Sequence, residues 1–339
     1  MIHSVGVPPG APTPPTPERP VATTITAVPP AAEVKRRSRR RLRDTRAGIL
    51  MSLPAIAGLI AFVAVPFGTA AVLSLYNVHV DQVRPPVFVG LDQYTRLFTD
   101  PVVSGAFLRS LLNNFVFAVV VIPVQTGLAL LLAVLLNRKL KGVRFFRTFF
   151  FMPVVFPMAL VTVIWRLILD RSSDGLLNAS MNFVTGGLAP AHDWLGSSAT
   201  ALGSVIVLSI WQGVGFQMVI ILAALQEIPE ERYEAAQLDR ANAWQQFVHV
   251  TVPGIRNTLI FVVLLTTILA FRIYDQVYIL IRTAGANEDA TQTLLYQATN
   301  AISSDNNLGR ASAISVVLFI IIVAITIIQR RVLRQRSEE

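Results

Sequence analysis

Polar and aromatic side chains stand inside two long apolar stretches of this chain, Leu202–Leu225 and Leu259–Ile281. Amides, hydroxyls and charged groups at such positions can hold a hydroxyl-rich solute by fixed hydrogen bonds, and aromatic rings can stack on it. Charges within long apolar stretches are costly, which makes them functional candidates. If the chain carries a solute across a membrane, the candidate solute-path residues are Trp211, Gln212, Gln217, Arg272, Tyr274, Asp275, Gln276 and Tyr278.

Several of these residues also have a structural explanation. Trp211 and Tyr278 suit packing or anchoring at a membrane interface. Arg272 and Asp275 are three positions apart, so on a helix they can form an ion pair. Close helix packing is the better explanation for two weaker candidates in a later apolar stretch, Ser312 and Ser315.

If residues 272–278 form one continuous helix, they present two faces. Arg272, Asp275 and Gln276 share one face, and Tyr274 and Tyr278 share another. Exposing the first face to lipid would be costly. We therefore expect the Arg272 face to line a cavity and the tyrosine face to pack on neighbouring helices.

The sequence offers little for covalent chemistry. It has no cysteine, which excludes disulfides, thiol catalysis and cysteine-based metal sites. Its four histidines are scattered without the spacing of metal ligands, and it has no paired carboxylates or nucleophile elbow. A Gly-x-x-x-x-Gly-Lys-Ser/Thr loop for nucleotide phosphates is also missing. We expect a non-catalytic chain that holds no cofactor or metal itself.

A polar segment, Tyr233–Pro253, separates the two apolar stretches and reads as two short helices with a break. Pro229 suits a first helical position, and the following glutamates suit a helix start. Asn242 is a suitable N-cap for a helix over 243–250, which Pro253 would end. Such a unit can dock into a groove of a soluble partner; an interfacial amphipathic loop is the alternative.

Composition indicates an all-α, polytopic membrane protein. Hydrophobic residues make up 53% of the chain and charged residues 14%. A membrane-spanning helix needs about 20 mainly apolar residues. The first of the six stretches that qualify is too long and too far from the N-terminus to be a cleaved signal. The six predicted spans are Ile49–Tyr76, Asn114–Leu136, Phe149–Leu169, Leu202–Leu225, Leu259–Ile281 and Leu308–Ile328.

Lys and Arg residues alternate in density between successive loops. They are concentrated in Lys35–Arg46, in Arg138–Arg147 and in the tail from Arg330, and they are sparser in the other loops. Positive residues mark the cytoplasmic side, so both termini and the polar segment should be cytoplasmic. Because these charges lie beside the predicted spans, anionic lipid explains the high pI better than nucleic acid does.

Three regions follow from these patterns. Residues 1–47 form a Pro-rich and basic segment that cannot bury a core and is expected to be a disordered cytoplasmic tail; recognition of a partner through its prolines is a less favoured role. Residues 48–332 hold the six spans, and residues 333–339 are a short cytoplasmic tail.

The polar segment resembles the EAA loop of permease subunits of bacterial ABC importers. In that family this loop is the coupling helix that docks on the ATPase subunit, and seven positions agree with its pattern. Arg240 departs from it, because the family usually has glycine there, which tolerates left-handed backbone. Either the turn has another geometry or Arg240 makes a partner contact of its own. The matching residues are Glu234, Ala235, Ala236, Asp239, Ala241, Phe247 and Pro253.

The resemblance extends from about Leu53 to Arg331 and is closest to sugar-type permeases, such as the larger maltose-permease subunit and the glycerol-phosphate permease A-type subunit. After Leu280 the family often has Thr-Gly-Gly-Gly-Pro, whereas this chain has Ile281–Ala286, a difference that bears on binding-protein contacts. Similar segments are Phe88–Asp100, Leu136–Arg147, Met152–Pro153, Phe271–Leu280 and Leu308–Ala313.

The resemblance implies an assembly in the bacterial plasma membrane. It consists of this chain, a second permease, two ATPase subunits that bind ATP and Mg, and an external solute-binding protein that delivers a sugar. ATP-driven closure would pass through the EAA loops and rock the helices between two packings.

For the solute, a neutral mono- or oligosaccharide is favoured because Asp275 is positioned to neutralise Arg272. A glycerophosphodiester or another polar solute is the alternative. A secondary transporter is less favoured, because it needs several ionisable residues at mid-membrane and the spans hold little beyond Asp275 and Arg166.

Overall fold

The computed structural model describes residues 49–81, 85–138, 141–188 and 190–335. Within these ranges the chain is almost entirely helical, with one short two-stranded sheet, which confirms the predicted all-α membrane class. The predicted tail 1–47 lies outside the described residues. The last helix runs to Gln335, past the predicted end of the spanning region at 332.

The chain divides into two units, Met1–Ala64 and Val65–Glu339. The described part of the first unit is a helix over 49–59 that continues into a π-helical turn, Ile60–Ala64. Its large apolar side chains, Phe62 among them, are exposed. A helix of this composition suits surroundings of lipid tails.

Five helical segments are long and apolar enough to cross a membrane, and one bent helix pair makes a sixth candidate when it is counted as one span. These agree with the six predicted spans, although their ends differ; the second begins ten residues earlier than predicted, at Ser104 instead of Asn114. The segments are 49–73, which ends in α2 (Val65–Leu73), α4 (Ser104–Leu136), the pair α5 (Val143–Val155) and α6 (Met158–Ile168), α8 (Ala201–Gln226), α12 (Arg256–Phe271) with α13 (Asp275–Ala284), and α16 (Leu308–Gln335).

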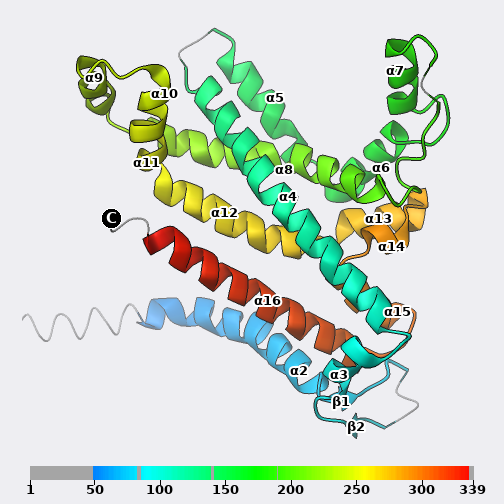
Figure 1. Ribbon diagram of the computed structural model, residues 1–339. Helices are drawn as coiled ribbons and strands as arrows, with labels where there is room; N and C mark the ends of the chain where they lie inside the picture. The colour runs from blue at the N-terminus through cyan, green and yellow to red at the C-terminus, as the bar shows by residue number, and fades with distance from the viewer. Residues whose placement is uncertain (1–48, 82–84, 139–140, 189, 336–339) are drawn as a thin grey trace, which may run out of the picture. The chain divides into compact units, whose positions relative to one another are not determined.

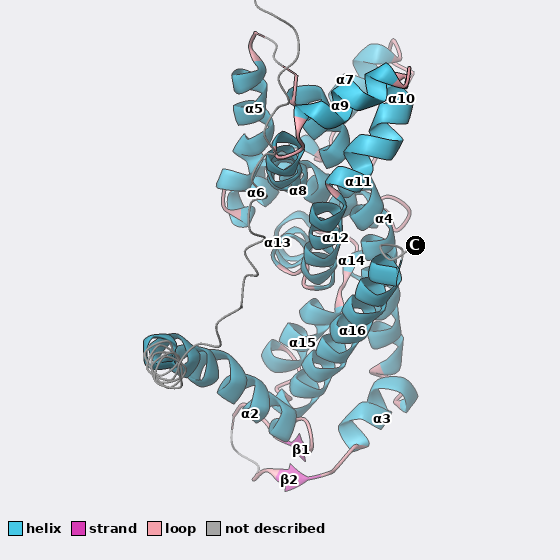
Figure 2. Cartoon of the chain, turned by 90° about the vertical axis from the view of Figure 1, so that its left-hand side faces the viewer, coloured by secondary structure: helices cyan, strands magenta, loops and turns pink. Residues whose placement is uncertain are grey.

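The remaining elements gather at the two ends of the spans in the second unit (Figure 1). Figure 2 looks onto the end that carries α9–α11. At this end lie α9 (Glu230–Leu238), α10 (Ala243–Gln246), a π-helical turn (Phe247–Thr251) and α11 (Val252–Gly254). At the other end lie β1 (Tyr76–Asn77) and β2 (Val87–Phe88), which pair antiparallel, with α3 (Asp92–Thr99), α7 (Leu176–Val184), α14 (Glu288–Thr291) and α15 (Leu294–Ser303).

The third predicted span, Phe149–Leu169, is not a single straight helix. α5 and α6 meet at an angle of 101°. Pro157 precedes α6, and both Phe156 and Pro157 have extended backbone (ψ 136° and 139°). Proline disfavours helical backbone in the residue before it and has no N–H to donate. The bend therefore follows from the Phe156–Pro157 step.

The fifth predicted span is also interrupted. α12 ends at Phe271, and α13 begins only at Asp275. Asn114 of α4 satisfies one backbone group before the break and one at the start of α15: its Nδ2 donates to the Phe271 carbonyl (3.3 Å) and its Oδ1 accepts from the Leu294 N–H (2.8 Å). Thr293 Oγ1 donates to the Ile273 carbonyl (3.0 Å). At membrane depth irregular backbone needs such partners. Residues distant in sequence therefore stabilise the break.

Buried apolar side chains pack α4 against α8 and α12 and form two clusters. One cluster lies toward α13–α15 and includes Phe107, Phe117 and Phe271. The other lies toward α9–α11 and includes Met218 and Ile221. Because α8 and α12 flank α9–α11 in sequence, this packing links both clusters to that loop.

Polar contacts tie α12 to two neighbouring helices. Gln217 Nε2 of α8 donates to Thr266 Oγ1 (2.6 Å), and Gln329 Nε2 of α16 donates to Thr267 Oγ1 (2.9 Å). Near the loop, Arg256 Nη2 donates to the Leu333 carbonyl (2.7 Å) close to the end of α16. Hydrogen bonds between helices hold neighbouring spans together at membrane depth. Adjacent threonines on α12 thus join α8 and α16 to one helix.

Two titratable groups at the α7 and α15 end are perturbed by their surroundings. Burial raises the pKa of Tyr296 to about 12, and the nearby Glu288 carboxylate adds to the rise. The Tyr296 hydroxyl therefore stays protonated and donates to Glu288 Oε1 (3.2 Å). Hydrogen bonds from Ser172 hold the pKa of Asp170 below its ordinary value. Both groups serve local structure.

Candidate functional site

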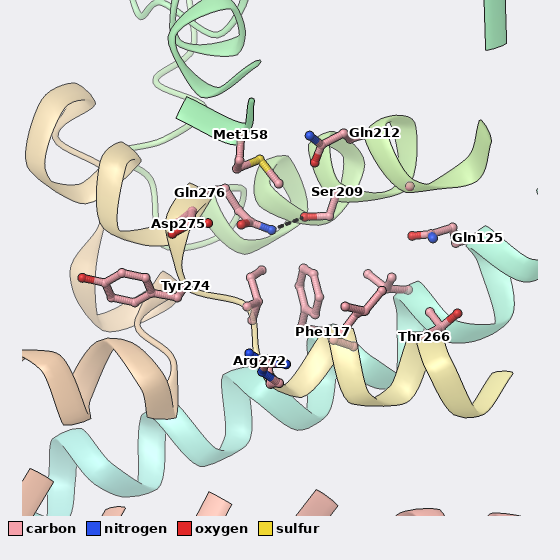
Figure 3. A pocket seen from close by; sticks show the side chains of 15 residues that line it. Phe117, Gln125, Met158, Ser209, Gln212, Thr266, Arg272, Tyr274, Asp275 and Gln276 are labelled. Atoms are coloured by element: carbon pink, nitrogen blue, oxygen red, sulfur yellow. Dashed lines mark hydrogen bonds between the residues drawn. The ribbon is translucent and has the colours of Figure 1, made fainter. Parts of the chain in front are cut away.

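A cavity of about 260 Å³ opens between α4, α6, α8, α12 and the break before α13. Figure 3 shows amide, hydroxyl, charged and aromatic groups around one space. This mixture can bind a polar solute through hydrogen bonds and ring contacts. The polar and aromatic lining consists of Phe117, Gln125, Ser209, Gln212, Thr266, Arg272, Tyr274, Asp275 and Gln276.

The break before α13 puts polar residues of the fifth span at the cavity. Irregular backbone is tolerated at membrane depth where it lines a cavity. Gln276 lies at the start of α13, and its Nε2 donates to Ser209 Oγ of α8 (3.2 Å). Five of the predicted solute-path residues thus line one space: Gln212, Arg272, Tyr274, Asp275 and Gln276.

Three predicted solute-path residues lie elsewhere. Gln217 is buried and donates a hydrogen bond to Thr266. Trp211 packs edge-on against Trp165 (5.8 Å between ring centroids). Tyr278 stacks on Tyr274 (5.3 Å) beyond the cavity lining. The packing explanation fits these side chains. Neither serine of α16, Ser312 or Ser315, lines the cavity.

Arg272, Asp275 and Gln276 line the cavity as expected, whereas the continuous helix that would give residues 272–278 two faces is absent. Because the helix is interrupted, Arg272 belongs to the break and Asp275 to the first turn of α13. Figure 3 shows Arg272 and Asp275 on different sides of the cavity. Within the described ranges neither has an ion-pair partner. Tyr274 lines the cavity together with Arg272 and Asp275, and it also stacks on Tyr278. It therefore belongs both to the cavity lining and to the tyrosine pair.

Gln125 of α4 is a lining residue that the sequence analysis missed. It is only 7% exposed and has no hydrogen-bond partner among the residues that the structure describes. Its amide lies against Gly213 of α8, where a Cβ would come within 2.5 Å of Gln125 Nε2. Its amide reaches the cavity and can pair there with a solute. The available signal was a lone glutamine inside the apolar stretch 114–136.

At the other end, the EAA segment forms α9, a tight turn and α10, as the sequence predicts in outline. Asn242 is the N-cap of α10: its Oδ1 accepts from the Gln245 N–H (2.9 Å), and Gln245 Oε1 accepts from the Asn242 N–H (2.8 Å). This reciprocal pair is a capping box. The predicted N-cap is therefore confirmed.

Three details of the segment differ from the prediction. Pro229 is the N-cap of α9 and not its first helical residue. The helix expected over 243–250 becomes π-helical from Phe247. Pro253 lies within α11, and the helical backbone ends after Gly254. These differences concern helix ends, which local patterns define least sharply.

Arg240 adopts left-handed backbone (φ 57°) at the end of α9. Its N–H donates to the Gln237 carbonyl (2.9 Å), and the Ala241 N–H donates to the Ala236 carbonyl (2.9 Å). These two bonds define a Schellman motif, in which glycine usually occupies the position of Arg240. The turn therefore keeps the geometry that suits glycine, which rules out the first of the two alternatives and leaves a partner contact of Arg240 open.

The EAA segment exposes apolar side chains. Leu238 is 85% and Trp244 is 70% exposed, and Trp244 packs on Phe247 (5.5 Å between ring centroids). Glu234 is exposed on α9. Beside them lies a hollow of about 590 Å³, lined by Arg232, Ala235, Ala236, Asp239, Ala241, Gln245, His249, Val250 and Pro253. Exposed apolar residues beside a hollow are typical of interaction surfaces.

Residues 97–338 match the family described as binding-protein-dependent transport system inner membrane component. The chain belongs to this family of ABC importer permeases, whose members are non-catalytic membrane subunits. It is therefore a multi-pass membrane protein of an ABC importer family and not a member of a secondary-transporter family.

Relatives cover nearly the whole chain. The probable ABC transporter permease protein YurN of Bacillus subtilis is 36% identical, over 86% of this chain and 97% of that protein. The trehalose/maltose transport system permease protein MalF of Thermococcus litoralis is 30% identical, over 89% and 98%. A solved bacterial ABC transporter for import of the acidic polysaccharide alginate has the same fold, with a TM-score of 0.73 at 19% identity, covering 88% of this chain and 99% of that one.

Proposed function

We propose that this permease forms, with a second permease subunit, the membrane path for a sugar that an external binding protein delivers. The observation that carries the proposal is the cavity, where Gln125, Ser209, Gln212 and Gln276 offer amides and a hydroxyl beside Phe117 and Tyr274. Hydroxyl-rich solutes need such groups. Relatives named for trehalose/maltose, lactose and arabinooligosaccharide transport support a sugar.

A neutral sugar remains the favoured solute, although the original reason changes. Arg272 and Asp275 are not paired, yet both line the cavity, which therefore offers one positive and one negative side chain. An anionic solute favours uncompensated cationic groups. An acidic oligosaccharide held by Arg272 is the second candidate, since this guanidinium has no ion pair in the described residues.

The cavity is tested by sugar uptake into vesicles that contain the assembled importer. We expect Gln276→Ala to weaken transport by about 1–2 kcal/mol of lost hydrogen bonding, roughly 5- to 30-fold. Ser315→Ala, at a serine of α16 that does not line the cavity, is the control for the loss of a polar group elsewhere in the spans. Maltose, trehalose and lactose serve as neutral probes, and an oligouronate as the acidic one.

The outcomes separate the possible roles. A loss for Gln276→Ala no larger than that for Ser315→Ala would refute a role of Gln276 in the solute path. Unchanged uptake for Gln276→Ala with a large loss for Tyr278→Ala would show that the solute contacts the tyrosines and not Gln276. If Arg272→Gln abolishes oligouronate uptake and the wild type ignores neutral sugars, the solute is acidic.

The proposed coupling site is the EAA segment, with Glu234 and the small Ala235–Ala236 face against an ATPase subunit that binds ATP and Mg. The exposed Leu238 and Trp244 support a protein partner at this end. The residues proposed for docking are Glu234, Ala235, Ala236, Asp239, Arg240, Ala241, Phe247 and Pro253.

Charge reversal tests this docking. Glu234→Lys should reduce ATPase association or uncouple ATP hydrolysis from uptake while membrane insertion stays normal, since the side chain is exposed. Glu230→Lys makes the same change on the same helix and serves as the control. Normal subunit composition and normal transport-linked ATP turnover in the Glu234→Lys importer would refute the docking role.

A further inference from the structure

α7 is an amphipathic helix whose apolar face points away from the protein. Leu176, Phe183 and Val184 fall on one side of the helix, at i, i+7 and i+8. Phe183 is 88% and Val184 is 82% exposed. On the opposite side Asn178 is buried. A helix of a water-soluble surface would be oriented the other way, with its apolar side on the core.

Asn178 fixes this orientation. Its Nδ2 lies within hydrogen-bond distance of three carbonyls, those of Asp170 (3.1 Å), Ser172 (3.0 Å) and His192 (3.0 Å). Its Oδ1 accepts from Trp194 Nε1 (2.8 Å) and from the His192 N–H (3.2 Å). A fully used, buried amide holds the polar side of α7 inward. The bonds of Asn178 to the segments before and after α7 therefore fix the apolar face in its outward position.

The surroundings of α7 indicate which partner covers this face. The sequence from Gly175 to Ala191 contains no charged residue. α7 follows α6 after a short connection, and α6 belongs to a candidate span with exposed apolar residues such as Val163 and Leu167. Figure 1 shows α7 lying across the direction of α8, at the end of the spans away from α9–α11. This is the direction of a helix that lies in the plane of a membrane surface.

We infer that α7 and the following turn through Leu188 are immersed in the outer interface of the lipid bilayer. Interfacial helices bury their apolar face at the boundary of headgroups and acyl chains. If a soluble protein docked here and then left, the same apolar residues would be exposed to water in each transport cycle. Docking surfaces for soluble proteins also carry a polar rim. An uncharged apolar face continuous with a span fits lipid better.

The absence of cysteine allows a direct test. Val184→Cys and Phe183→Cys are labelled with an environment-sensitive fluorophore in the assembled importer, in phosphatidylcholine–phosphatidylglycerol vesicles. Asn182→Cys, on the polar side of α7, is the matched control. We expect the Val184 and Phe183 labels to emit at shorter wavelength and to be quenched by lipids with a nitroxide near the headgroup. The Asn182 label should be quenched more by aqueous iodide.

Three results would overturn the inference. Iodide quenching of the Val184 and Phe183 labels without nitroxide-lipid quenching would place the face in water. Protection from both quenchers only after the solute-binding protein is added would assign the face to that protein. Protection from both quenchers in the importer alone would assign it to the second permease. Quenching by the nitroxide lipid with and without the binding protein supports lipid immersion.

Discussion

At the scale of single residues, the cavity and the coupling segment depend on side chains with unusual local conditions. Gln125 is buried without a protein partner, and Gly213 leaves the space for its amide. Arg240 holds left-handed backbone that an L-residue adopts only at a cost. A conformational cost of this kind is often retained where function requires the residue. Both positions are therefore candidates for a role beyond folding.

Arg240 allows its backbone cost and its side-chain role to be separated. Arg240→Gly should stabilise the isolated chain by about 1 kcal/mol, because glycine adopts φ near 57° without strain. Arg240→Ala keeps a Cβ and should give no such gain. Thermal unfolding of both variants in lipid nanodiscs measures the difference; equal stabilities for the two would contradict the strain argument. A loss of ATPase affinity shared by both variants would reveal a partner contact of the Arg240 side chain.

At the scale of elements, two interrupted spans shape the second unit. The α5–α6 bend follows from a proline step and is local in origin. The α12–α13 break has no proline in it and is held by Asn114 and Thr293 from other elements. The cavity lies beside the second break and includes Met158 from the start of α6. Both interruptions therefore contribute to the same space.

Asn114 should be essential for the α12–α13 break. Asn114→Ala leaves the Leu294 N–H and the Phe271 carbonyl without this partner, at about 1–3 kcal/mol for each buried group. We expect a lower unfolding temperature and a loss of sugar uptake. Asn137→Ala, at the exposed end of the same helix, is the control and should be nearly neutral. If the two variants unfold at the same temperature, Asn114 does not support the break.

At the scale of the whole molecule, the two ends of the second unit differ in kind. One end carries the EAA segment and the tie between Arg256 and Leu333 of α16. The other carries α7, α14 and α15. Contacts through Thr266 and Thr267 connect α8, α12 and α16 between these ends. Motion of the EAA segment should therefore reach the cavity through α8 and α12 together.

The orientation in the membrane is a prediction from the distribution of Lys and Arg. Single cysteines at Ser303, at the end of α15, and at Lys141, before α5, should react from opposite sides of the membrane. Ser303→Cys should react with an impermeant thiol reagent on intact cells, and Lys141→Cys only in inverted vesicles. Reaction of both on intact cells would contradict the six-span arrangement and the cytoplasmic position of the EAA segment.

The sequence alone determined what depends on composition and near neighbours. Apolar length predicts the spans, and Asn242 predicts the N-cap of α10 because an N-cap side chain bonds to backbone within one helical turn. The tertiary structure decided which polar side chains meet. Gln217 and Gln276 look alike in sequence, yet one is bound to Thr266 within the packing and the other lines the cavity. The deciding contacts, such as Asn114 with Phe271 and Leu294, join residues far apart in the chain, so no local pattern contains them.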